Sequence, residues 1–531
     1  MTAKILTVTL LVCFFALMIG VGVYCRKHTS NVDGFVLGGR SVGPWLTAFA
    51  YGTSYFSAVI FVGYAGQFGW NFGVASTWIG LGNAFIGSLL AWSVLGRRTR
   101  ITKVMTQHLN SKTMPDFFGK RYGSEKLKVA ASAIVFVFLI PYTASLYNGL
   151  SSLFNSAFEI PYWVCILVMA VLTGVYVIFG GYMATAINDF IQGIIMLIGI
   201  AAVIAAVLSG QGGFTQAVVQ LSQIPSDVTA TAGQQGAFTS FFGPDPMGLL
   251  GVVVLTSLGT WGLPQMVGKF YAIKNENAIK KGTIISTFFA IIVAGGCYFL
   301  GGFGRLFMSQ DEVTAKGFDA IIPTMLSTLS PVIIAIVIVL VLAASMSTLS
   351  SLVLTSSSTL TLDVVAPLRK GGMSEKRKIL VMRLLVVFFI ALSAAIAILK
   401  DTIWSDVVFI AQMMGVSWGA LAGAFLAPFL YGLYWKKTTR ASVAACFVFG
   451  AGLMIVQLCK SVGWISISGG FLGFVFANSL YSGVFAMIGG LILVPIVSLL
   501  TQKSCPKDAE TMFTCYNKKT VVSAKRALEE A

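Results

Sequence analysis

A run of hydroxyl side chains follows a long apolar segment in the second half of the chain. Residues 332–342 are valine, isoleucine, leucine and alanine throughout, and the run begins directly after them. This continuity predicts one membrane helix, in which hydroxyl groups need protein partners because hydrocarbon offers none. At helical spacing one face carries Ser347, Ser350, Ser351 and Ser358, with Thr348 and Thr355 beside them.

That face presents a row of neutral oxygen atoms. Hard cations such as sodium take oxygen ligands, and hydroxyls together with unwound backbone carbonyls can hold such an ion and release it again. A structural interpretation is also open, since serine and threonine in membrane helices bond to the carbonyl four residues earlier or allow close packing. The face by itself does not decide between the two.

The composition is that of a protein that crosses the membrane many times. The 531 residues are 56% hydrophobic and 10% charged, with a mean hydropathy of +0.86, whereas a soluble domain carries about 25% charged residues. The net charge is +17, but the positive residues lie in short loops between apolar spans. This pattern indicates membrane orientation rather than a nucleic-acid-binding face.

Nothing in the sequence favours an enzyme. The eight cysteines are scattered singly without a CxxC pair, and the two histidines, His28 and His108, lie in cationic loops. The spans contain no glycine-rich phosphate loop, no HExxH motif, no catalytic Cys/His pair and no paired carboxylates. We therefore expect neither a catalytic site nor a structural metal site.

Apolar runs of about 20 residues predict an all-α membrane protein with thirteen spans. The first run is followed by Arg26 and Lys27 rather than by a cleavage site, so we expect a retained span and not a signal peptide. The spans lie near residues 5–24, 45–66, 74–95, 129–154, 162–179, 186–208, 249–267, 283–307, 332–355, 379–398, 405–434, 441–458 and 481–500.

The lysines and arginines predict the orientation of these spans. All but five of the 36 lie in loops that fall on one side of the membrane if the chain alternates: 25–44, 96–128, 268–282, 363–383, 435–440 and the tail from 501. The positive-inside rule then places the N-terminus outside and the C-terminus in the cytoplasm of a cell membrane. The polar loop 209–248, in a stretch without lysine or arginine, is expected to be external.

Two spans contain residues that weaken a helix. Span 45–66 has Gly52, Gly63 and Gly66 with hydroxyl residues near its middle, and span 249–267 contains Gly259-Thr260-Trp261-Gly262-Leu263-Pro264. Proline has no amide donor, so the turn before it loses a hydrogen bond. Two broken helices five spans apart are typical of inverted-repeat transporters with a binding site at mid-membrane. Glycine and proline also serve packing in membrane helices, which is the alternative.

Several motifs, in order and spacing, resemble the sodium:solute symporter family over roughly residues 5–500. They are Gly38-Gly39-Arg40-Ser41-Val42-Gly43-Pro44, Pro115-Asp116-Phe117-Phe118 with Lys120-Arg121, Gly180-Gly181 with Asn188-Asp189 and Gln192, and Ala344 to Ser351. The resemblance implies a LeuT-type fold of five plus five spans in an inverted repeat.

The implied division of the chain follows from that fold. It gives an extra N-terminal helix and loop (1–44), a first repeat (45–208), an external loop (209–248), a second repeat (249–434), two peripheral helices (435–500) and a cytoplasmic tail (501–531).

The resemblance also implies ion sites. The family's sodium site falls on the carbonyls of Thr53, Phe56 and Ala344 and the hydroxyls of Ser347 and Thr348. Some members have a second sodium site, which here matches Asp189, Ser347, Ser350 and Ser351. The alternative for Asp189 is a solvated carboxylate or a helix cap, whereas an intramembrane acid is by default functional.

The solute cavity is expected between the two broken helices and span 129–154. Candidate liners are Tyr55, Ser57, Tyr142, Asn148, Trp261 and Gln265, each of which is alternatively an ordinary packed residue. The chain departs from the proline-transporting pattern at Tyr55 and at Gly262-Leu263-Pro264-Gln265, and is more similar to the branch that carries pantothenate and small carboxylates. No lysine or arginine is expected inside a cavity-forming helix.

These observations predict a secondary active symporter that uses sodium as coupling ion and imports a small organic solute, in the first instance a carboxylate such as pantothenate or a monocarboxylate. Proline-type amino acid, sugar and sialic acid symport remain alternatives. A transporter-like solute sensor is a further alternative, disfavoured because the tail after residue 500 has no room for a signalling domain. The expected partners are the solute, sodium and the lipid bilayer, without nucleic acid or an obligate protein partner.

Overall fold

The computed structural model describes residues 2–97, 105, 108–158, 161–369, 372–399 and 409–516. These residues form helices joined by loops, and one isolated parallel bridge joins Val42 to Ile273. The end of the expected tail, 517–531, and the start of the expected span 405–434 lie outside the described residues. The all-α prediction is confirmed for the part of the chain described.

The helices that correspond to the apolar runs of the sequence differ in length. They are α1 (Thr2–Tyr24), α3 (Pro44–Tyr55), α4 (Ala65–Phe72), α5 (Thr77–Gly82), α8 (Glu125–Phe158), α9 (Tyr162–Gly210), α11 (Pro246–Leu258), α12 (Pro264–Ala272), α13 (Glu276–Ala290), α14 (Gly296–Gly301), α17 (Pro331–Leu360), α19 (Glu375–Ile398), α21 (Phe409–Tyr434), α22 (Arg440–Ser461) and α24 (Ser479–Leu500).

Short helices occupy the connections. They are α2 (Val32–Leu37), α7 (Met114–Tyr122), α10 (Phe214–Ser222), α15 (Gln310–Lys316), α16 (Ile321–Ser327), α18 (Ala366–Leu368), α23 (Gly470–Val475) and α25 (Ala509–Phe513). Wide π-helical turns extend some long helices, at η3 (Val59–Tyr64), η5 (Asn83–Leu90), η6 (Trp92–Arg97), η10 (Ile291–Gly295) and η13 (Thr361–Val365).

Ten helices of the described chain are long and apolar enough to cross a membrane, or eleven if the bent pair α11–α12 counts as one span. The protein is therefore a multi-pass membrane protein. The 49-residue α9 is more than twice the roughly 20 residues that one crossing needs. It contains Gly181 at φ 53°, outside helical geometry, where the sequence separated spans 162–179 and 186–208. The count of thirteen spans stays a prediction.

Both helix breaks that the sequence predicts are present, although the first has a different cause. α3 ends at Tyr55, Phe56 has extended backbone, and the helix resumes after Ser57. The glycines that suggested this break are helical instead. A Cβ at Gly52 would lie 2.5 Å from the Phe289 ring, so this glycine serves close packing rather than the break.

The second break lies where the sequence placed it. α11 passes through a short 3-10 turn (η9, Gly259–Gly262) to Leu263, which is extended, and α12 begins at Pro264. The two helices meet at a bend of 48°. Proline suits the first turn of a helix because its missing amide would have no partner there.

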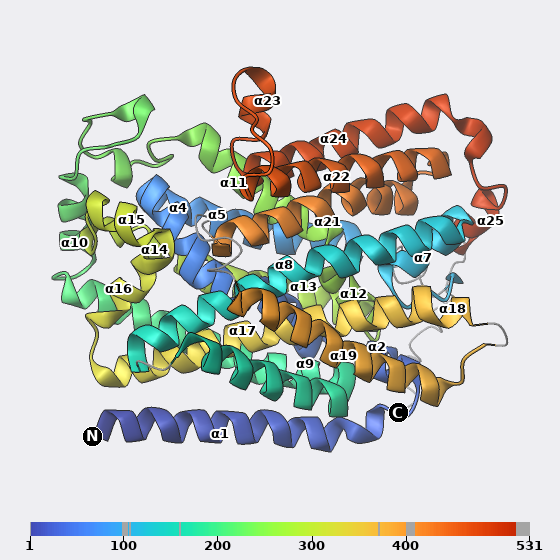
Figure 1. The fold of residues 1–531 in the computed structure, drawn as a ribbon, viewed down its shortest axis with the longest axis horizontal. Helices are drawn as coiled ribbons and strands as arrows, with labels where there is room; N and C mark the ends of the chain where they lie inside the picture. The colour runs from blue at the N-terminus through green and yellow to red at the C-terminus, as the bar shows by residue number, and fades with distance from the viewer. Residues whose placement is uncertain are drawn as a thin grey trace, which may run out of the picture.

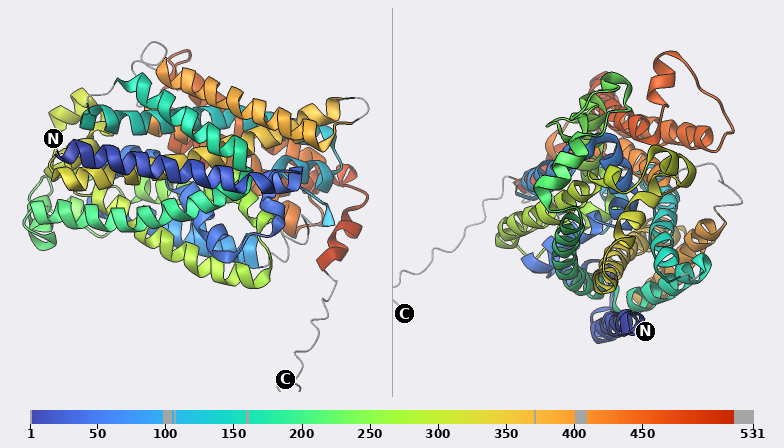
Figure 2. Two further views of the ribbon diagram at one scale, coloured as in Figure 1. Left: turned by 90° about the horizontal axis from the view of Figure 1, so that it is seen from below. Right: turned by 90° about the vertical axis from the view of Figure 1, so that its left-hand side faces the viewer.

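α17 lies at the centre of the bundle, and its residues 340–354 are all buried. It packs against α8, α9 and α3, while α21 packs against α8 and against the peripheral α22 and α24. Figure 1 shows this arrangement, with α1 along one edge and α24 along the opposite one. The two views of Figure 2 confirm that α1 lies on the outside of the bundle, where it contacts α9.

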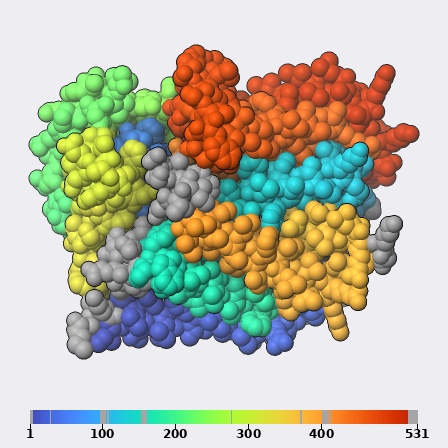
Figure 3. All heavy atoms as spheres, viewed as in Figure 1, coloured from blue at the N-terminus to red at the C-terminus, as the bar shows by residue number. Residues whose placement is uncertain are grey.

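The two ends of the bundle differ in character. α10, α15 and α16 gather at one end, and α7, α18 and α25 at the other (Figure 1). The segment around α23, between α22 and α24, projects from the surface in the space-filling view of Figure 3. The end with α7 carries basic side chains such as Lys112, Lys120 and Lys128.

Candidate functional site

The break after α3 meets the hydroxyl face of α17. The hydroxyl of Ser347 donates to the carbonyl oxygens of Thr53 at 3.2 Å and Ala344 at 3.0 Å. The hydroxyl of Thr348 lies 3.2 Å from the carbonyl oxygen of Thr53, 3.1 Å from that of Phe56 and 3.2 Å from that of Ala344. The structure therefore brings together all five groups that the resemblance assigned to one sodium site.

This cluster has the chemistry of a site for a small hard cation. It contains three carbonyl and two hydroxyl oxygens, all neutral, and the five residues are at most 1% exposed. The extended Phe56, with φ −92° and ψ 125°, turns the chain out of helical geometry beside α17. Carbonyl and hydroxyl oxygens suit sodium because they offer partial negative charge without the strong grip of a carboxylate.

Asp189 has a partner that the sequence did not suggest. Its carboxylate is fully buried in α9, and Oδ2 lies 3.7 Å from Nζ of Lys269 in α12. The same Nζ donates to the hydroxyl of Ser351 at 2.9 Å. The expected partner was sodium held with Ser350 and Ser351; Ser350 instead donates to the carbonyl of Ser347 at 2.9 Å.

The expectation that no lysine or arginine lies inside a cavity-forming helix is wrong. Lys269 was counted with the basic loop 268–282, but α12 continues to Ala272 and the residue is only 3% exposed. α12 packs against both α3 and α17, which carries the lysine into the interior of the protein. Its charge is opposed by Asp189.

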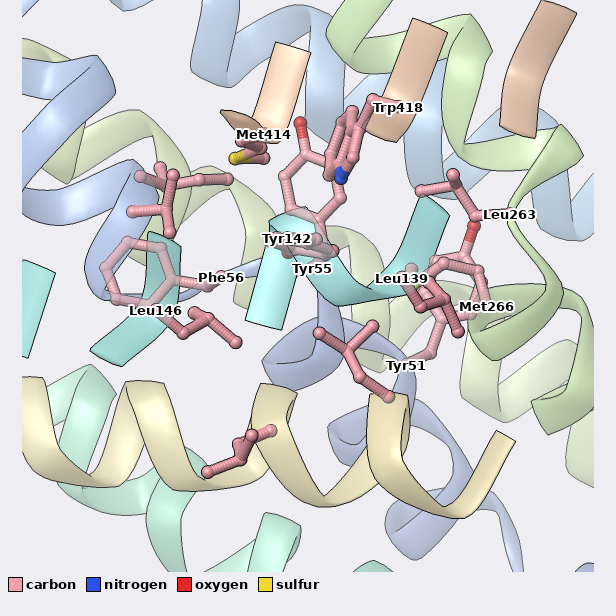
Figure 4. Close-up of a cluster of buried hydrophobic side chains, with 14 of the residues drawn as sticks. Tyr51, Tyr55, Phe56, Leu139, Tyr142, Leu146, Leu263, Met266, Met414 and Trp418 are labelled. Carbon is pink, nitrogen blue, oxygen red and sulfur yellow. The ribbon is translucent and has the colours of Figure 1, made fainter. Parts of the chain in front are cut away.

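Aromatic side chains meet around the first break. Tyr55 lies with its ring centroid 5.8 Å from that of Trp418 in α21, and Tyr142 in α8 packs edge-on against the same indole at 6.2 Å. Figure 4 shows the three rings together, with Phe56 and Met414 on one side and Leu263 and Met266 on the other. Residues from both broken helices, α8 and α21 thus meet at one place.

Several buried polar atoms near this cluster have no hydrogen-bond partner within the described chain. They are the hydroxyls of Ser57 and Tyr142, both amide atoms of Asn148, Oε1 of Gln265 and Nε1 of Trp418. Burying such atoms unpaired costs free energy, so they are suited to bind a solute or water. The structure does not place all expected liners in one cavity.

Two of the expected liners have structural partners instead. The indole N–H of Trp261 donates to the carbonyl of Ile86 at 3.1 Å, and the hydroxyl of Tyr55 donates to the carbonyl of Thr256 at 3.2 Å. Tyr55 also lines a small cavity with Asn83.

A second cavity lies beside α12 and α17. Gln265, Lys269 and Ser351 line it, and Lys112 and Thr113 also contribute to its wall. Hydroxyl groups of α17 follow its length, at Ser351, Thr355, Ser358 and Thr359.

Sequence reasoning missed Lys269, Trp418 and Ser54. The Ser54 hydroxyl lies 2.8 Å from that of Ser351, which continues the polar contacts from α12 through α17 to α3. The sequence shows Trp418 only as a tryptophan inside an apolar span. Such a residue more often packs against its neighbours than lines a binding site.

Comparisons with known proteins show which proteins this chain is similar to. The model of the sodium:solute symporter family matches residues 35–450. The sodium/proline symporter of Staphylococcus aureus strain JH9 is 28% identical over 524 residues, which cover 96% of this chain and 95% of that protein, and the protein of strain COL matches equally. A solved structure of a Na+-coupled sialic acid symporter, substrate-bound and outward-open, superposes with a TM-score of 0.67 at 16% identity, covering 93% of this chain and 98% of that one.

Proposed function

Because the chain belongs to the sodium:solute symporter family, we propose that it is a sodium-coupled secondary active symporter that imports a small organic solute by alternating access. The observation that carries the proposal is the cluster of five buried oxygens between the broken α3 and the centre of α17. A sodium ion there would join the two elements, because its ligands come from both.

The direction of coupling follows from linkage. An ion that favours the state able to bind solute must raise the affinity for solute, and the solute raises the affinity for the ion by the same factor. One sodium ion moving down about 100 mV supplies about 2.3 kcal/mol, and a tenfold gradient adds about 1.4 kcal/mol. With one sodium ion per cycle, a solute without net charge could therefore be accumulated about 500-fold. A monoanionic carboxylate moved with one sodium ion carries no net charge across the membrane, so the tenfold gradient alone would accumulate it about tenfold.

For the architecture we propose thirteen spans in a LeuT-type inverted repeat, with the divisions inferred from the sequence. The likeness of fold to a sodium-coupled symporter supports this, as do the two broken helices. The basic residues around α7 support a cytoplasmic position for that end in a cell membrane, with the N-terminus outside and the C-terminus inside.

For the solute we propose a small carboxylate, such as pantothenate or a monocarboxylate, held between the aromatic cluster and the unpaired polar groups of Ser57, Tyr142, Asn148 and Gln265. Hydroxyl and amide donors can bind a carboxylate without a cationic side chain, and Lys269 is already opposed by Asp189. The relatives named above are a sodium/proline symporter and a Na+-coupled sialic acid symporter, so proline-type and sialic acid symport stay the alternatives.

The test is uptake into proteoliposomes from a panel of proline, pantothenate, short monocarboxylates, sialic acid and hexoses, with and without an inward sodium gradient. We expect one member to be accumulated only with sodium. Sodium-dependent uptake of proline, a sugar or sialic acid would support the proposal of symport but contradict the proposed carboxylate solute. Binding of a solute without transport under any gradient would indicate a sensor and contradict the proposal.

A further inference from the structure

The ammonium group of Lys269 lies in a place where a mobile cation would otherwise be expected. Its Nζ lies 2.9 Å from the hydroxyl of Ser351 and 3.7 Å from the carboxylate of Asp189. The ring of Tyr182 lies 5.3 Å from it, in the cation–π range. These groups are oxygens and an aromatic face, all of which favour positive charge.

The neighbourhood of Asp189 makes a cation necessary. The residue is fully buried, and its carboxylate faces the ammonium of Lys269 at 3.7 Å. A bare carboxylate inside a membrane protein is costly unless a positive charge opposes it. Among the residues that the structure describes, Lys269 is the cationic side chain paired with this carboxylate.

The same oxygens would be the ligands of a second sodium ion. Asp189 comes from α9, Ser351 from α17 and Ser54, hydrogen-bonded to Ser351, from α3. One carboxylate and two hydroxyls from three elements make a reasonable partial shell for sodium. The ammonium of Lys269 carries the same charge and contacts two of these groups, the hydroxyl of Ser351 and the carboxylate of Asp189. Two cations on one buried carboxylate would leave an unopposed positive charge, so ammonium and sodium exclude each other.

We propose that the ammonium of Lys269 competes with a second sodium ion for Asp189 and Ser351, and that this tethered cation keeps the protein at one bound sodium. The inference rests on the proposed function, in which one sodium ion binds between α3 and α17. It adds that the protein binds no second sodium ion. Lys269 also lines the cavity that includes Lys112 and Thr113. A fixed charge there opposes Asp189 without the entry of an ion from solution.

The experiment is equilibrium binding of radioactive sodium to the purified full chain in nanodiscs. We expect one sodium per wild-type chain, bound with about tenfold to a hundredfold lower affinity in Thr348→Ala. Lys269→Met, which keeps length but removes the charge, should bind two, and Lys269→Arg, which keeps the charge, should bind one. The double variant Lys269→Met with Asp189→Asn should return to one, because the second site then lacks its carboxylate.

The outcomes separate the two proposals. Two sodium ions on the wild type would overturn the inference without any variant, even if Lys269→Met fails to fold. One sodium on both wild type and Lys269→Met would also overturn it, while the first site stands. No sodium on the wild type but one on Lys269→Met would support the competition at Asp189 and contradict the proposed first site.

Discussion

The hydroxyl of Thr348 donates a hydrogen bond of 3.1 Å to the carbonyl oxygen of Phe56, the extended residue that directly follows α3. This contact joins the broken helix to the buried centre of α17. The same hydroxyl lies 3.2 Å from the carbonyl of Thr53, so it lies between two carbonyls of the break. Replacing these hydroxyl contacts by an ion would tie α3 to α17 more strongly, which is how ion binding would favour one conformation.

Thr348→Ala is expected to weaken sodium binding about tenfold to a hundredfold. It removes one of two hydroxyl ligands, and a polar contact to a charged group contributes about 1.5–3 kcal/mol. Thr348→Ser keeps the hydroxyl and should bind sodium with nearly the wild-type affinity. Equilibrium sodium binding measures both, and equal affinities for the two variants would show that the hydroxyl is not a ligand.

Gly181→Ala is expected to destabilise the protein by more than about 1 kcal/mol. Gly181 has φ 53°, and a Cβ there would lie 2.8 Å from the carbonyl oxygen of Phe35. Gly210→Ala, at the C-terminal end of α9, has open space around it and should be nearly neutral. Thermal unfolding in detergent compares them. Equal midpoints for the two variants would mean that the turn at Gly181 tolerates a side chain.

Lys128→Met is expected to cost about 3–5 kcal/mol, the usual result of removing one partner from buried charges. Nζ of Lys128 lies 3.4 Å from Asp116 and 3.9 Å from Asp363, and both carboxylates are buried. The exposed Lys126 on the same helix supplies the control, Lys126→Met. The midpoint of thermal unfolding should fall for the first variant only. An unchanged midpoint for Lys128→Met would contradict this prediction. It would show that the hydrogen bond from Thr113 to Asp363, at 2.5 Å, is sufficient to stabilise the buried carboxylates.

Arg305→Lys is expected to loosen the segment 209–248, although the charge is kept. The guanidinium lies 3.8 Å from the ring centroid of Phe238 and 4.2 Å from that of Trp70, and it donates to Asp227 at 2.7 Å. Lysine cannot stack in this planar manner. Limited proteolysis of the segment should be several-fold faster than in wild type. The exposed Lys316, changed to Gln, is the control; similar rates for both variants would contradict this role.

The sequence was informative where local chemistry determines structure. Pro264 has no amide donor and begins α12 directly after the break, as proline at the first position of a helix commonly does. The hydroxyl face of α17 follows from helical spacing. The five oxygens around Thr53 and Ser347 were named from the resemblance to a family, and the structure places them together. Their role as sodium ligands stays a proposal.

The rest depends on packing between distant elements. Lys269 stands close to Lys274, Lys280 and Lys281 in the sequence, which is the pattern of a basic loop. Its burial arises because α12 packs against α3 and α17, and no local pattern encodes that depth. The first break was attributed to glycines because glycine weakens helices, whereas Gly52 is used for close approach to Phe289.

The most direct test of the central claim compares two serines of α17 that are two residues apart. The hydroxyl of Ser347 faces the break, at 3.2 Å from the carbonyl of Thr53, whereas that of Ser345 bonds to the carbonyl of Val341 within its own helix. Sodium-driven uptake of the solute identified by the panel is measured in proteoliposomes for Ser347→Ala and Ser345→Ala. The sodium concentration for half-maximal uptake should rise at least about tenfold for Ser347→Ala and stay near wild type for Ser345→Ala. An unchanged sodium dependence in Ser347→Ala would contradict a sodium site at this cluster.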